Sequence, residues 1–150
     1  MAVKPIPEGF HTVTPYLLVS GVAGLIDFLK QAFNAEEIHR SASPDGTVMH
    51  AQIKIGDSMV MMGEAGGEWK PMPIMLYLYV DDVDAWYHRA LKAGGTSERE
   101  LTDEFYGDRV GAVRDPCGNQ WWMATHVEDV TPDEMARREA ERSQKATASS

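Results

Sequence analysis

The sequence predicts an α+β fold: two tandem βαβββ units that form curved mixed sheets around a pocket, followed by a C-terminal helix. Three observations support this prediction. A segment near the N-terminus recurs 61 positions later, an amphipathic helical pattern follows each copy, and a capped helical pattern closes the chain. With 150 residues, 43% of them hydrophobic and 25% charged, the chain has the size and composition of one globular domain.

The repeat aligns Tyr16–Val19 with Tyr77–Val80, two apolar runs that each precede a helical pattern. Further matches, the last after one inserted residue, are Gly46 with Gly107, Ala51 with Ala112, and Gly56-Asp57 with Gly118-Asn119. Each half therefore predicts a strand, a helix and three strands. We expect a single domain over residues 1–142, with repeat one at about 11–63, repeat two at about 74–126, and a Gly- and Pro-rich linker between them.

Two helices are expected where apolar residues recur at i, i+3 and i+4 spacing, over residues 22–33 and 83–91. The second has clear ends, because Asp81 or Asp82 can cap its start and the Gly94-Gly95 pair can end it.

A third helix is expected from Pro132 to about Arg142. Thr131 and Glu134 form a capping-box pattern there, and proline suits the first helical position. Residues 143–150 are expected to be a disordered tail.

Composition argues against several classes of protein. The apolar stretch Ile74–Val80 is too short to cross a membrane and the N-terminal segment lacks a signal-peptide core, so we expect a cytoplasmic protein with no membrane partner. The formal charge of -9, without a Lys/Arg-dense run, argues against nucleic acid as a partner. Cys117 is the only cysteine, which excludes an internal disulfide.

The alternation of side chains along the strands predicts which residues face away from the helices. In Ile74–Val80 the aliphatic residues share one face, so Met75, Tyr77 and Tyr79 share the other. In the stretch 48–55, the same argument turns His50 away from the helices. Matching the last strand to the fourth through the repeat aligns Trp122 with Val60 and places both on the face turned away from the helices.

Together these faces predict an aromatic, largely apolar pocket for a small molecule. Its expected members are Thr14, Tyr16, His50, Val60, Met62, Met75, Tyr77, Tyr79, Trp122 and His126. The same residues would also suit the inside of a closed sheet or a dimer contact.

The segment 105–109 is expected at the rim of this pocket, with Tyr106 and Arg109 as ligand contacts. Arg109 could hold a ligand carboxylate or phosphate, or it could pair within the chain with Asp108, Asp115 or Glu104.

His50 is the candidate catalytic residue, since an imidazole can act as a general acid or base near neutral pH. Both His50 and His126 could instead be structural histidines bonded to the backbone or to a carboxylate. A displaced metal site can be drawn from His11, His50, His126 and either Glu64 or Glu128, although no pair has a recognisable ligand spacing.

The repeat, with DPCGN before the last strand and YLYVDDVDAWY opening the second half, resembles the glyoxalase, bleomycin-resistance and dioxygenase superfamily, also called vicinal oxygen chelate proteins. The stretches HTVTPYLLV, GxxMHAQIKIGDS, FYGDRVGAVRDPCGN and ATHVEDVTPDEM are similar to its PhnB-like branch. The resemblance spans nearly the whole chain. It implies a homodimer in which the curved sheets form the site.

Metal-dependent members of that superfamily carry His or Glu on the inward faces of the first, fourth, fifth and eighth strands. The resemblance aligns these places with Thr14, Val60, Met75 and Trp122, none of which is a credible ligand for a divalent metal. No metal or other cofactor is therefore expected.

Two functions follow. The first is a metal-free protein that binds an apolar, aromatic or cationic small molecule in an aromatic groove. The alternative is a lyase, isomerase or dioxygenase-type enzyme of the same superfamily, with a displaced metal site or with His50 as its acid-base group.

Overall fold

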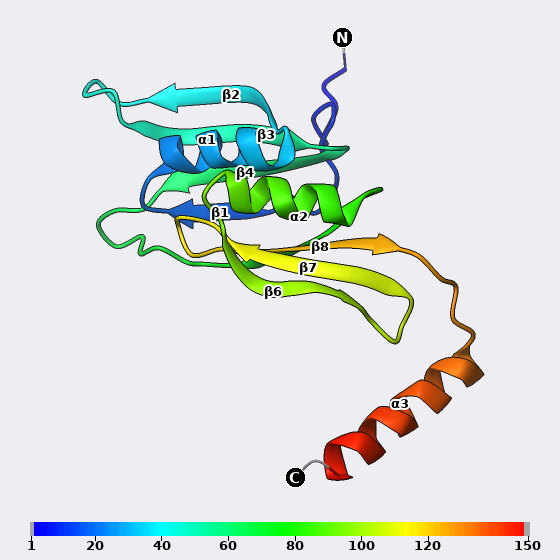
Figure 1. Cartoon of the computed structure of the whole chain (residues 1–150). Helices are drawn as coiled ribbons and strands as arrows, with labels where there is room; N and C mark the ends of the chain where they lie inside the picture. Colours follow the sequence, from blue (N-terminus) through cyan, green and yellow to red (C-terminus); the bar gives the residue numbers. More distant parts are fainter. Residues whose placement is uncertain (1, 149–150) are drawn as a thin grey trace.

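The computed structural model describes residues 2–148 and shows two four-stranded sheets with two helices packed between them (Figure 1). The elements in chain order are β1 (Tyr16–Val19), α1 (Val22–Phe33), β2 (Glu36–Ala42), β3 (Val48–Ile55), β4 (Ser58–Glu64), β5 (Met75–Tyr79), α2 (Val83–Lys92), β6 (Thr96–Asp103), β7 (Asp108–Arg114), β8 (Gln120–His126) and α3 (Pro132–Ala148). The predicted βαβββ order is confirmed in both halves.

Each sheet is mixed. The first has the order β1-β4-β3-β2 and the second the order β5-β8-β7-β6. In each sheet the strand before the helix pairs in parallel with the last strand of its unit, and the other pairs are antiparallel. A parallel pair needs a long crossover connection, and in each unit the chain from the helix onward supplies it.

The two sheets share one hydrophobic core. The first contributes Leu17 and Ile53 and the second contributes Trp121, while Phe33 of α1 stacks on Trp86 of α2 with ring centroids 5.5 Å apart. The Phe33 ring also lies 5.3 Å from the Trp121 ring. Because both sheets turn one face to this core, the other face of each sheet, here called its outer face, points away from it (Figure 1).

The prediction for β4 is wrong by one residue. Met62 is 0% exposed and Val60 is also buried in the core, because they lie across from Ala51 and Ile53, which pack under the helix. Met61 lies across from Tyr16 as Trp122 lies across from Tyr77, so the offset of the repeat holds here without the inserted residue. A one-residue slip reverses the face of every side chain in a strand.

The helix boundaries agree with the capping signals. The Asp82 carboxylate accepts a hydrogen bond from the Ala85 N–H at 3.2 Å, and α2 ends just before Gly94. Thr131 caps α3 by accepting from the Glu134 N–H at 3.2 Å.

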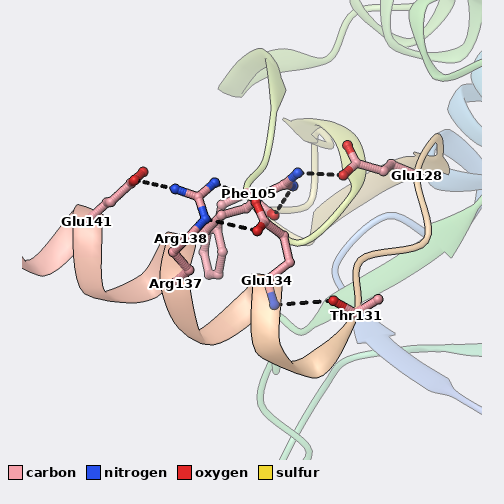
Figure 2. Close-up of polar contacts among 7 residues, drawn as sticks. All are labelled: Phe105, Glu128, Thr131, Glu134, Arg137, Arg138 and Glu141. Carbon is pink, nitrogen blue, oxygen red and sulfur yellow. Dashed lines mark hydrogen bonds and ion pairs between the residues drawn. The ribbon is translucent and has the colours of Figure 1, made fainter.

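The expectation of a disordered tail from residue 143 is wrong, because α3 continues to Ala148. Residues 149–150 lie outside the described part of the chain. Figure 2 shows what anchors this helix: the Arg138 guanidinium donates to the Phe105 carbonyl at 2.8 Å and pairs with Glu128. Arg142 also lies over the Phe105 ring, 4.3 Å from its centroid. Within residues 2–148, no helix is long and apolar enough to span a membrane.

The turn between β6 and β7 requires glycine at position 107. Gly107 has φ +99°, and a Cβ there would lie 2.1 Å from the backbone oxygen of Glu128. Its own carbonyl accepts hydrogen bonds from the N–H groups of Val127 and Glu128 at 2.9 and 3.1 Å. This close approach ties the turn to the segment after β8.

We therefore predict that Gly107→Ala destabilises the protein more than Gly46→Ala does. Both positions have a positive φ, which costs a non-glycine residue about 1–2 kcal/mol, but Gly46 has open space where a Cβ would lie. The clash at Gly107 should add about 1–3 kcal/mol to the loss of unfolding free energy. Urea denaturation of both variants measures the difference, and equal losses would contradict this account of the turn.

Candidate functional site

The outer face of the second sheet carries a cluster of aromatic and ionisable side chains. Tyr77 and Tyr79 project from β5, Asp108 begins β7, and His126 ends β8 directly across from Asp108. Tyr106 adjoins them from the β6–β7 turn and interacts with the Tyr77 phenol. We call Tyr77, Tyr79, Asp108 and His126 the tyrosine–aspartate cluster.

Asp108 is the centre of this cluster. Its carboxylate accepts hydrogen bonds from the Tyr79 hydroxyl at 2.8 Å, the Tyr77 hydroxyl at 3.4 Å and His126 Nδ1 at 2.8 Å. The residue is only 3% exposed, so these bonds replace the water that a carboxylate would otherwise bind. Three strands are joined through one side chain.

His126 lies between two carboxylates. Nδ1 faces Asp108 and Nε2 lies 2.7 Å from an oxygen of Asp129. Both ring nitrogens can donate only when the imidazole is protonated, and these two hydrogen bonds raise the pKa of His126 above its ordinary value. These two neighbours therefore favour the protonated form of His126.

A raised pKa predicts how the contribution of His126 to stability depends on pH. This contribution is complete below the unfolded pKa of about 6.5 and is lost as pH rises through the higher folded-state pKa. The difference in unfolding free energy between the protein and its His126→Gln variant should thus shrink between pH 5.5 and 8.5. His39→Gln, at an exposed position, is the control. A difference that grew with pH would contradict the assignment.

The tyrosines of the cluster remain protonated. Burial raises the pKa of Tyr77, with a further contribution from its hydrogen bond to Tyr106, and the hydrogen bond to Asp108 raises the pKa of Tyr79. Their rings lie 5.3 Å apart, and Trp122 lies beside Tyr77 on the same face. The face is thus aromatic, with neutral hydroxyl groups.

The outer face of the first sheet carries a second group. The Tyr16 hydroxyl lies 3.4 Å from His50 Nδ1. It also lies over Gly63, where a Cβ would be 2.4 Å from the hydroxyl oxygen. Beside Tyr16 is a cavity of about 510 Å³, also lined by Met49 and, from the segment after β4, by Trp69 and Met72.

Within one chain these two groups do not meet. Tyr16 and His50 lie on the outer face of the first sheet, whereas Met75, Tyr77, Tyr79, Trp122 and His126 lie with Asp108 on the outer face of the second. Both sheets turn their inner faces to the same core, so the outer faces point in different directions. Each group is placed as the strand alternation predicted, and the two are on separate surfaces.

Arg109 is placed differently from the prediction. Its guanidinium binds both oxygens of Asp84 in α2, at 2.8 and 3.2 Å, and also contacts Asp103. It therefore lies on the helix-packed face of β7, opposite Asp108, and not in the pocket. Arg109 thus pairs within the chain, but with none of the three partners that the sequence suggested.

The residues drawn into a displaced metal site have other partners. Glu64 accepts hydrogen bonds from the N–H groups of Gly21 and Val22 at the start of α1, and Glu128 pairs with Arg138. In the described residues 2–148, no three His, Cys, Asp or Glu side chains gather as a metal site would require.

The places where metal-dependent members of the superfamily carry their ligands, which lie on what are here called the outer faces, also supply no ligand. With β4 in its observed register they are Thr14, Met61, Met75 and Trp122, which offer no imidazole or carboxylate. The residues present do not fit a divalent metal at that place.

Sequence reasoning missed Asp108 as a site residue. The sequence suggests Asp108 only as a partner for Arg109, since nothing local connects it to β5 and β8. The signal lay in the strand pairing, because a residue across from His126 and beside two tyrosines must be a partner for all three.

These two mixed sheets and their aromatic outer faces define a member of a superfamily of paired βαβββ proteins. The chain matches the Glyoxalase/Bleomycin resistance protein/Dioxygenase superfamily over residues 9–123, and it belongs to that superfamily. An uncharacterized protein of Mycobacterium bovis is 37% identical over 134 residues, which cover 82% of this chain and 88% of that protein. An uncharacterized protein of Mycobacterium tuberculosis is 37% identical, covering 82% and 79%.

Solved structures show the same fold. TioX from Micromonospora sp. ML1 has a TM-score of 0.64 and 24% identity, over 77% of this chain and 99% of that one. A PhnB protein from Bacillus cereus, described as a putative 3-demethylubiquinone-9 3-methyltransferase, has a TM-score of 0.63 and 19% identity, over 77% and 99%. The fosfomycin resistance protein FosX from Listeria monocytogenes, solved with Mn(II) and sulfate, has a TM-score of 0.60 and 18% identity, over 85% and 96%.

Proposed function

We propose that this protein binds a small apolar, aromatic or cationic molecule against the aromatic outer faces of its sheets, without a metal. One observation carries the proposal: Tyr77, Tyr79 and Trp122 share an outer face, on which the two tyrosines bind a carboxylate that is already satisfied within the protein. Aromatic rings with a few fixed polar groups are what ligand sites for flat molecules contain.

The site is completed by a second copy of the chain. Tyr16, Met72, Met75 and Tyr79 are large apolar side chains left at least about half exposed, and they lie on or beside outer faces that cannot meet within one chain. Exposed apolar surface of this kind marks an interface. In a homodimer, the first sheet of one copy would face the second sheet of the other, which brings the Tyr16–His50 group opposite the tyrosine–aspartate cluster.

The dimer is testable by placing a charge in the interface. We expect the protein to sediment as a dimer at micromolar concentration and Met75→Lys to shift it toward the monomer, because a buried unpaired charge is costly. Val3→Lys changes the charge equally at a residue outside the faces, and should not. A wild-type protein that sediments as a monomer at 100 micromolar would contradict the shared site.

Ligand binding is testable with the neutral aromatic probe N-phenyl-1-naphthylamine, whose fluorescence rises in apolar surroundings. We expect Trp122→Ala to weaken its binding about tenfold, as the loss of about 1.4 kcal/mol of ring contact would. Val3→Ala should have no effect. Dialysis against EDTA should leave the dissociation constant unchanged, and binding abolished by EDTA would contradict a metal-free site.

A metal measurement addresses the enzyme alternative, which the approach of Tyr16 to His50 on an open face keeps relevant. The binding proposal expects no stoichiometric metal in protein purified without added metal. Stoichiometric metal that is lost on His50→Ala would favour the enzyme.

A further inference from the structure

We propose that the outer face of the second sheet selects a ligand that carries an ammonium group on an aromatic body, and rejects carboxylates and other anions. This inference rests on the proposed function and names the ligand class of the same site. It comes from the direction in which the hydrogen bonds of the tyrosine–aspartate cluster run.

The first step is the orientation of the hydroxyl groups. A phenol has one proton to donate, and Tyr79 gives its proton to Asp108 at 2.8 Å. Tyr77 turns its hydroxyl to the same carboxylate oxygen, at 3.4 Å. What these hydroxyl groups can still offer a ligand is lone pairs. The Tyr77 and Tyr79 hydroxyls thus accept hydrogen bonds from a ligand but have no proton to give it.

The second step is the charge of the cluster. The basic side chain in contact with Asp108 is His126, and its second ring nitrogen is bound to Asp129. Asp108, His126 and Asp129 together are therefore negative even when the imidazole is protonated, and His126 has no N–H left for an anion. Arg109, the nearby cation on β7, lies on the opposite face with Asp84 and Asp103.

The third step is the effect of burial and of the rings. Asp108 is 3% exposed, so water screens its charge less than it would at the surface. Tyr77, Tyr79 and Trp122 bring three aromatic rings to this side of the sheet, and the face of an aromatic ring attracts a cation electrostatically. An ammonium gains from the negative cluster, from the phenolic lone pairs and from the rings. A carboxylate of the same shape meets repulsion and finds no free donor in the tyrosine–aspartate cluster.

Three probes with the same ring and similar chains measure this selectivity: 2-phenylethylammonium, 2-phenylethanol and 3-phenylpropionate. Their dissociation constants are obtained by titrating each probe and following the chemical shifts of backbone amide signals in NMR spectra of the full chain. We expect the ammonium to bind tightest and the carboxylate at least about tenfold more weakly, which corresponds to about 1.4 kcal/mol. Asp108→Asn should reduce this ratio to about threefold or less.

Asp103→Asn is the matched control. It removes the same charge from the adjoining strand, but its carboxylate pairs with Arg109 on the other side of the sheet. It should leave the ratio near the wild-type value. Equal losses in the two variants would mean that the net charge of the protein, and not the cluster, sets the preference, and would overturn the inference.

Tyr79→Phe keeps the ring and removes the lone pairs, so the inference survives a failure of Asp108→Asn to fold. We expect it to weaken the ammonium about threefold or more and to leave 2-phenylethanol binding within twofold. If the affinity of the ammonium relative to 2-phenylethanol were unchanged by Tyr79→Phe, the role of the hydroxyl would be overturned.

The failure of the inference and of the proposed function can be told apart. If N-phenyl-1-naphthylamine binds and depends on Trp122, but 3-phenylpropionate binds as tightly as the ammonium, the inference is overturned and the binding function stands. If none of the four probes binds, both are overturned.

Discussion

The position of the aromatic outer faces depends on how the two sheets share one hydrophobic core. Phe33 of α1 lies against Trp86 of α2 and Trp121 of β8, so the two units are packed through large rings and not merely joined by a linker. Because side chains alternate along a strand, a sheet that buries one face in this core must present the other outward. The aromatic surfaces on β1, β5 and β8 follow directly from that packing.

The same alternation separates two uses of charge on β7. Asp108 and Arg109 are neighbours in the chain, yet they lie on opposite faces of the strand. Arg109 forms a salt bridge with Asp84 that connects the sheet to α2, which is a structural contact. Asp108 accepts hydrogen bonds from Tyr79 and His126 on the outer face. The buried carboxylate is thus both a cross-strand connection and the electrostatic centre of the candidate site. A group of this kind fixes the tyrosine hydroxyls before any ligand arrives, which lowers the cost of binding.

The fold alone does not determine the chemistry. FosX from Listeria monocytogenes, solved with Mn(II), has the same architecture at 18% identity. Here the places that the superfamily resemblance assigns to metal ligands carry Thr14, Met61, Met75 and Trp122, while Glu64 caps a helix and Glu128 pairs with an arginine. Function in such a fold depends on the side chains of the site, so the tyrosine–aspartate cluster is a better guide to this protein than its superfamily.

The βαβββ repeat, the starts of α2 and α3, and the outward faces of β1, β3 and β5 could be predicted from the amino-acid sequence, because caps and side-chain periodicity are local properties. The register of β4, which places Met62 in the core, and the partners of Arg109 and Asp108 could be known only from the folded protein. A register depends on how a strand pairs with its neighbours, and an ion pair depends on which helix or strand folding brings within reach. Neither is written in the spacing of nearby residues, and for that reason the centre of the candidate site appeared only once β5, β7 and β8 lay side by side.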